Sequence, residues 1–198
     1  TLTNANTYNG GTVVEAGKLE GRALAQGSPF GTGNVEMKGG TLQVTGVAGT
    51  ETNTFVPEFK VSAPAVLAVD ATASSDKTRL TLGVLKRADA ILMLVSVTGP
   101  LGGPTTRERI SVVDANVPLM AGGVIPWIFA RASLTDPTLN LVGLSGSDIV
   151  RLESGSDINL VANGNPFIAT SSTVNSLTGD VSLSALQLNA TTVDGAFT

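Results

Sequence analysis

The chain has 198 residues, of which 42% are hydrophobic and 14% charged, and its net charge is −4. It is too apolar for a disordered chain. It also lacks the excess of Lys and Arg that nucleic-acid-binding proteins use to contact phosphates. Because it contains no cysteine or histidine, disulfides, thiolate chemistry, Cys/His zinc sites and histidine-dependent triads are excluded. We expect the short charged clusters at residues 86–87 and 107–109 to be solvated.

The first stretch, residues 1–11, is polar and lacks the basic-then-apolar pattern of a signal peptide. It leads directly into an internal repeat. Residues 11–20 and 34–43 align when Gly17 is placed on Gly40, at an offset of 23 residues (40 − 17). We expect each copy to be strand, bend and strand, with the glycine at the bend where the backbone needs a positive φ.

Apolar residues alternate with polar ones on both sides of each bend, the period-2 pattern of a half-buried strand. A coil of this size cannot bury its own apolar face, but stacked coils can bury it against one another. The pattern therefore predicts a solenoid whose inward-facing residues include Val14, Leu19, Val35, Met37 and Leu42.

Four motifs carry a family resemblance: NTYNGGT at 6–12, VEAGKL at 14–19, GTGNV at 31–35 and GGTLQ at 39–43. They resemble the autotransporter-associated β-strand repeat, and the match is good over about the first 45 residues. Residues 82–88 and 147–152 are similar to connecting sections of very large repetitive bacterial surface proteins. The resemblance implies a parallel β-helix passenger that is displayed on the cell or released from it, and it implies no activity.

Strand-like fragments continue along the chain with a less regular spacing. The stretch 87–97 has room for a short helix, but its β-branched end favours a strand. Its apolar run is far shorter than the roughly 20 residues that cross a bilayer, so no membrane span is expected. The fragments with apolar residues two apart are 66–69, 80–82, 110–112, 139–141, 158–160 and 186–188.

Residues 100–136 form the least regular region, rich in Gly and Pro. We expect a loop that folds over the solenoid wall, with Trp127 and Phe129 as its hydrophobic anchor. An aromatic residue that stacks on a ligand is the alternative.

A pentapeptide, SGSDI, occurs at 145–149 and again at 154–158. The nine-residue spacing is that of calcium-binding toxin repeats, which would place calcium near Asp148 and Asp157. Two imperfect copies are too few to supply six to eight oxygen ligands. Turns built around aspartate are therefore favoured, and no metal site is predicted.

Acid catalysis on a polysaccharide requires carboxylates held close together. The acidic residues are scattered singly, although Glu15 and Glu36 hold nearly equivalent repeat positions and are candidates for adjacent coils. No nucleotide-binding glycine motif is present. We therefore predict no catalytic residue, no cofactor and no metal, with a polysaccharide-degrading β-helix enzyme as the less favoured reading.

Together these patterns predict an all-β, right-handed parallel β-helix over residues 1–198, one solenoid segment of a larger repetitive protein. The predicted function is a non-catalytic structural module of an exported bacterial surface protein. We expect its partners to be other copies of itself or adjacent modules, joined by end-to-end β-stacking, since neither end of the sequence offers a cap. The alternative function is an adhesin that binds glycan or protein. No nucleic acid is expected as a partner.

Overall fold

The structure is a computed structural model. It describes residues 1–23, 27–49, 51–71, 77–96, 101–102, 107–114, 117–119, 123–133, 135–136 and 139–152, and the backbone of four short strands between 167 and 194. The elements in these ranges are all β-strands, which confirms the all-β prediction. The stretch 87–97 contains a strand, as favoured, and the predicted fragment 158–160 lies outside the described residues.

Ten strands form two rows in which neighbouring strands are parallel. The odd-numbered strands lie in one row and the even-numbered strands in the other, so the chain crosses from row to row after each strand. The first row consists of β1 (Thr12–Val14), β3 (Val35–Met37), β5 (Thr52–Val61), β7 (Thr78–Arg87) and β9 (Glu108–Val112). The second row consists of β2 (Lys18–Arg22), β4 (Thr41–Thr45), β6 (Ala65–Asp70), β8 (Leu92–Ser96) and β10 (Val124–Arg131). This alternation makes the fold a β-solenoid.

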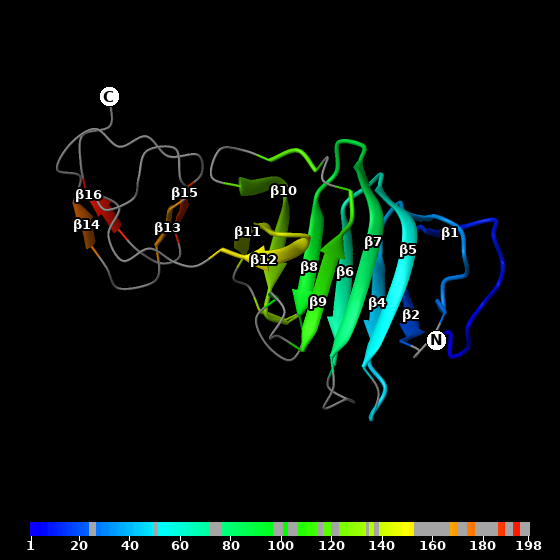
Figure 1. Cartoon of the computed structure of the whole chain (residues 1–198). Helices are drawn as coiled ribbons and strands as arrows, with labels where there is room; N and C mark the ends of the chain where they lie inside the picture. The colour runs from blue at the N-terminus through cyan, green and yellow to red at the C-terminus, as the bar shows by residue number, and fades with distance from the viewer. Residues whose placement is uncertain are drawn as a thin grey trace.

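An antiparallel hairpin of β11 (Asn140–Ser145) and β12 (Asp148–Arg151) joins the two rows at one end. Strand β12 pairs with β9, and β11 pairs with β10, both in the antiparallel sense. The twelve strands therefore form one continuous sheet that begins at β1, turns through the hairpin and ends at β2. Figure 1 shows the hairpin at the end of the solenoid opposite to β1 and β2.

Two short parallel pairs follow in the last part of the chain. Strand β13 (Phe167–Ala169) pairs with β15 (Leu186–Leu188), and β14 (Val174–Ser176) pairs with β16 (Thr192–Asp194). The predicted strand fragment at 186–188 is therefore confirmed.

The strand register reproduces the 23-residue repeat. Thr12 lies opposite Val35 in the first row, and Leu19 lies opposite Leu42 in the second. At the predicted bends, Gly17 and Gly40 have positive φ values of 71° and 66°. A Cβ on Gly40 would lie 2.6 Å from the carbonyl oxygen of Gly17, so close stacking as well as backbone conformation requires glycine there.

Successive coils lengthen along the chain, which is why the repeat becomes hard to follow after its second copy. In the first row, the spacing between register partners rises from 23 residues (Thr12 to Val35) through 24 (Val35 to Phe59) and 26 (Thr52 to Thr78) to 30 (Leu80 to Ile110). In the second row it rises from 23 (Leu19 to Leu42) through 25 (Leu42 to Leu67) and 27 (Leu67 to Leu94) to 36 (Leu92 to Ile128). No fixed period describes such a series.

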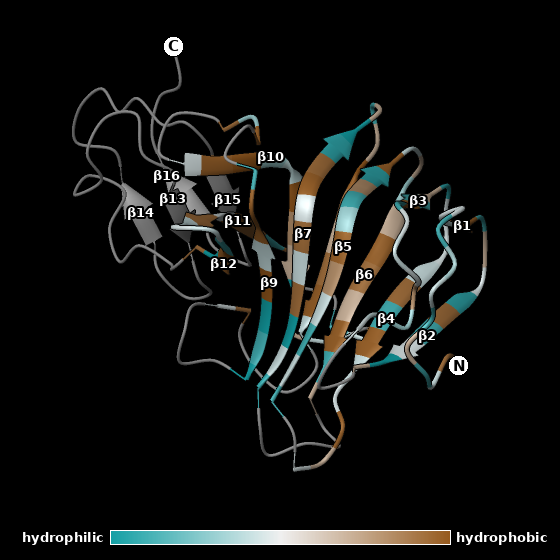
Figure 2. Cartoon of the chain, turned by 45° about the vertical axis from the view of Figure 1, so that its right-hand side comes forward, coloured by the Kyte–Doolittle hydropathy of each residue, from teal (hydrophilic) through white to brown (hydrophobic). Residues whose placement is uncertain are grey.

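One apolar core fills the space between the rows. Of the five residues predicted to face inward, Val14, Val35, Met37 and Leu42 are buried, and Leu19 packs against the core while partly exposed. Buried and more exposed positions alternate along β5 and β7, with one change of phase in the middle of each strand, and Figure 2 shows bands of contrasting hydropathy along both strands. The core continues without interruption to Val142 and Ile149 of the hairpin.

Where the structure describes it, the region 100–136 contains two strands that the sequence does not predict as part of the rows. Strand β9 continues the first row in register with β7, and β10 continues the second row beside β8. Trp127 therefore lies in a strand and not in a covering loop. It is 2% exposed, belongs to the core and has the guanidinium of Arg87 5.8 Å from its ring centre. Trp127 is thus a core residue of a strand and not the anchor of a covering loop, and Phe129 lies in the same strand, partly buried.

Candidate functional site

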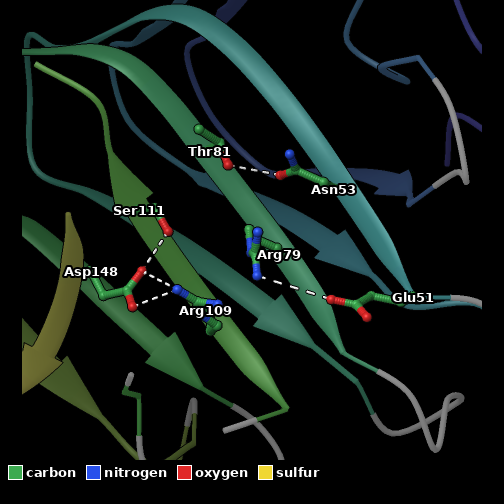
Figure 3. A network of polar contacts seen from close by, with 7 residues as sticks. All are labelled: Glu51, Asn53, Arg79, Thr81, Arg109, Ser111 and Asp148. Atoms are coloured by element: carbon green, nitrogen blue, oxygen red, sulfur yellow. Dashed lines mark hydrogen bonds and ion pairs between the residues drawn. The ribbon is translucent and has the colours of Figure 1, made fainter. Parts of the chain in front are cut away.

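A strip of polar side chains crosses the outer face of the first row (Figure 3). Neighbouring side chains in a strand point to opposite faces, and since Thr78 and Leu80 are buried, Arg79 and Thr81 face outward. Register then places Asn53 beside Arg79 and Arg79 beside Arg109 on adjacent strands. We call this set the outer polar strip; it consists of Glu51, Asn53, Arg79, Thr81, Arg109, Ser111 and Asp148.

The strip is tightest where the hairpin meets β9. The guanidinium of Arg109 donates to both carboxylate oxygens of Asp148, at 2.8 and 2.6 Å, and the Ser111 hydroxyl donates to the same carboxylate at 2.7 Å. The side chains of Arg109 and Asp148 are only 13% and 6% exposed. A buried, hydrogen-bonded pair of this kind is strongly destabilising to break. It holds β12 against the last strand of the first row.

Toward β5 the strip becomes looser and more exposed. Arg79 lies 4.0 Å from the Glu51 carboxylate, which is 61% exposed. Thr81 donates a 2.7 Å hydrogen bond to the side-chain oxygen of Asn53. Exposed ion pairs at such distances contribute little to stability, so these groups remain accessible to a polar partner.

An exposed aromatic ring borders this looser part. Phe55 is 46% exposed and lies opposite Thr81 in the register. Its ring lies close to Gly83, where an added Cβ would be 3.3 Å from the ring tip. A ring held near the sheet beside hydroxyl, amide and guanidinium groups combines an apolar surface with directional hydrogen-bonding groups. Binding sites for small polar molecules use the same combination.

Glu108 forms a second polar contact, inside the solenoid. It is 1% exposed; one oxygen accepts a hydrogen bond from the Ala71 backbone amide and the other from the Ser96 hydroxyl, both at 2.6 Å. The carboxylate thus joins β9 to the ends of β6 and β8.

The prediction that residues 107–109 are solvated is wrong for Glu108 and Arg109. The period-2 pattern of 110–112, extended back by two residues, would have placed Glu108 inward.

Glu36 is the centre of a polar cluster on the outer face of the first row. It accepts a 2.7 Å hydrogen bond from Ser62 and lies 3.1 Å from the Lys60 ammonium and 4.0 Å from Lys38. The hydrogen bond from Ser62, followed by that from Lys60, lowers the pKa of the Glu36 carboxyl below its ordinary value. These contacts tie β3 to the next coil.

The structure places Glu15 and Glu36 on adjacent coils, as expected, but not directly opposite each other. Register places Glu36 opposite Val13, two residues before Glu15. Glu36 instead binds groups on the following coil, as the contacts above show.

The first SGSDI copy forms the turn between β11 and β12, with Gly146 at a φ of 62°. The preference for a turn is thus confirmed there. The carboxylate of Asp148, however, binds the side chains of Arg109 and Ser111. The second copy, with Asp157, lies outside the described residues. Within the described ranges, no three acidic side chains gather closely enough to hold a metal ion.

No helix among the residues whose positions the structure gives is long and apolar enough to span a membrane. Comparisons of the chain with protein-family models, with curated proteins and with solved structures gave no match.

Proposed function

We propose that the chain is a non-catalytic structural module of an exported bacterial surface protein, such as an element of a stalk, fibre or surface layer. In this role the solenoid gives the protein length and stiffness, and it associates with other copies of itself or with adjacent modules. The sequence motifs shared with autotransporter repeats support the cell-surface location.

The observation that carries the proposal is the single core that runs from Val14 to Ile149 through coils stacked in register. Each coil is buried by its neighbours, which is how a solenoid gains length without a separate core for each unit. The polar contacts described above serve the same architecture, because Glu108, Asp148 and Glu36 each accept hydrogen bonds from groups on other strands or from residues just beyond their ends.

Location is tested on the cells that produce the protein. Antibodies raised against the chain should label intact cells, and limited protease treatment of those cells should release its peptides. Labelling that requires permeabilised cells would contradict the proposal.

The purified chain should also release no new reducing ends from a panel of polysaccharides, and turnover that one carboxylate substitution abolishes would contradict the non-catalytic role.

Adhesion to a glycan is the second candidate function, and Phe55 beside the outer polar strip favours it. Exposed aromatic rings next to hydrogen-bonding side chains suit the alternating apolar and hydroxyl faces of a sugar. If the strip binds glycans, Phe55→Ala should weaken binding to an immobilised polysaccharide at least about tenfold, or roughly 1.4 kcal/mol. Ile91→Ala, at a residue beside the second row that is 48% exposed, is the matched control. Equal binding by both variants would remove this candidate.

A further inference from the structure

The outer face of the first row holds several of its positive charges close to carboxylates. Lys60 lies 3.1 Å from the Glu36 carboxylate, and Arg109 lies 2.6 Å from that of Asp148. Lys86 likewise forms a close ion pair with a glutamate of β5. Cations that are paired this closely have little charge left for a partner outside the chain.

Two cations at the start of β7 are exceptions. The Arg79 side chain is 31% exposed, and its ion-pair partner among the described residues is Glu51, 4.0 Å away and itself 61% exposed (Figure 3). Within the same part of the chain, the Nε of Arg79 has no hydrogen-bond partner. Lys77 lies two residues earlier, so strand alternation places it on the same face, and it forms no ion pair with any described residue. The described fold therefore leaves these two charges without a close carboxylate.

The exposed ring of Phe55 borders these cations on the neighbouring strand. Register places Asn53 opposite Arg79 and Phe55 opposite Thr81, so Phe55 and Arg79 are diagonal neighbours. Their Cα atoms are about 8 Å apart, given the strand spacing and the rise per residue. A sugar ring that stacks on Phe55 would therefore hold its substituents within reach of the long Arg79 side chain, with the Asn53 amide and the Thr81 hydroxyl beside it.

We propose that the surface around Phe55 and Arg79 binds an acidic polysaccharide, with one carboxylated sugar stacked on the Phe55 ring and its carboxylate bound by Arg79. The inference rests on the glycan-binding candidate of the proposed function and names its substrate class. A guanidinium binds a carboxylate through two parallel hydrogen bonds. Lys77 attracts the next carboxylate along the same polymer, and Glu51 competes with the ligand for Arg79.

A matched pair of polysaccharides tests the charge requirement. Alginate and its methyl ester share one sugar backbone and differ in the charge of their carboxyl groups. The full chain should bind immobilised alginate at least about tenfold more tightly than the ester, and added salt should weaken this binding. Equal binding of alginate and its ester would overturn the acidic substrate class and leave glycan adhesion standing.

Polyglutamate tests whether charge alone is sufficient, because it carries carboxylates and no sugar rings. Since the proposed site also needs a ring to stack on Phe55, polyglutamate should compete with alginate at least about tenfold less effectively than free alginate does. Competition by polyglutamate that equals that of alginate would overturn the proposal, because the surface would then attract any polyanion.

Substitutions on β5 and β7 test the named residues. Arg79→Gln should weaken alginate binding at least about tenfold and leave the weak binding of the ester unchanged. Arg22→Gln removes the same charge from an exposed position of the second row and is the matched control. Glu51→Gln removes the competing carboxylate and should tighten alginate binding about threefold, as expected for release of an exposed ion pair. Circular dichroism and melting curves check that each variant folds.

The combined results separate this inference from the function on which it rests. If Phe55→Ala weakens binding to both polymers while folded Arg79→Gln binds both like wild type, glycan adhesion stands and the acidic substrate class is wrong. If the wild-type chain binds neither alginate nor any neutral polysaccharide, the inference and the adhesion candidate are both overturned, and the structural function stands.

Discussion

Gly33 lies where two successive coils come into backbone contact. A Cβ at this position would be 2.5 Å from the Gly11 amide nitrogen and 2.6 Å from the Asn9 carbonyl oxygen. Backbone atoms cannot move aside as the end of a flexible side chain can, so the spacing of the coils itself requires glycine. Gly10 lies 23 residues (33 − 10) earlier, at the equivalent position of the preceding repeat, yet a Cβ there would meet nothing within 4 Å. The two glycines thus have different physical roles that composition alone does not distinguish.

We predict that Gly33→Ala lowers the free energy of unfolding by about 2 kcal/mol, within the range for overpacking a close contact. Gly10→Ala should leave it within about 0.5 kcal/mol, as expected where nothing is crowded. Chemical denaturation of both variants measures the difference. Equal stability of the two variants would show that the coils are not in close contact at Gly33.

Glu36 provides a residue-level prediction of pH dependence. Its pKa is lowered in the folded chain, chiefly by the Ser62 hydrogen bond, so its contribution to stability is fully present above the ordinary value of 4.5. It is lost as the pH falls through the lowered folded-state value. Glu36→Gln should therefore melt below wild type at pH 7, and the two melting temperatures should converge under acidic conditions. A difference that is the same at pH 7 and pH 3 would contradict this assignment.

Among the elements, the first two coils are predictable from sequence and the hairpin is not. A constant 23-residue spacing determines the register of β1 with β3 and of β2 with β4. The pentapeptide at 145–149 fits both a stacked repeat and an antiparallel turn, and only contacts with a distant segment decide between them. The deciding partner of Asp148 is Arg109, 39 positions earlier. For the same reason, local sequence patterns do not predict which residues form the outer polar strip, because its members come from strands far apart in the sequence.

We predict that Asp148→Ala destabilises the chain by about 3–5 kcal/mol, because it leaves the largely buried Arg109 without its carboxylate partner. Replacing both residues, by Arg109→Met with Asp148→Leu, should recover much of this loss, because no unpaired charge then remains. Glu51→Gln breaks a long, exposed contact and serves as the control, with a change below about 1 kcal/mol. Thermal and denaturant unfolding measure all three; a double variant no more stable than Asp148→Ala would contradict a purely ionic role.

Along the described solenoid, the strands of the first row are shortest at the end where β1 and β3 lie, longest in its middle, and of intermediate length at β9 beside the hairpin. Strands β1 and β3 have three residues each, whereas β5 and β7 have ten. Short strands bury little apolar surface, and within the described residues β1 has a paired strand on one side only. Long strands inside the sheet are paired on both sides, and the hairpin extends this protection to the last coil. Stability should therefore vary along the axis, as it does in other stacked-repeat proteins.

Hydrogen exchange followed by mass spectrometry should show this gradient directly. Under native conditions, amides of β1 and β2 should exchange first and those of β5 to β8 last. Amides of β9 should be protected nearly as well as those of β7, because the hairpin pairs with β9 and packs Ile149 into the core. Asp148→Ala should raise exchange in β9 and β12 while leaving β1 unchanged, since the hairpin and β1 lie at opposite ends of the described solenoid. Wild-type exchange that is fastest at β9 would show that the hairpin does not protect the last coil.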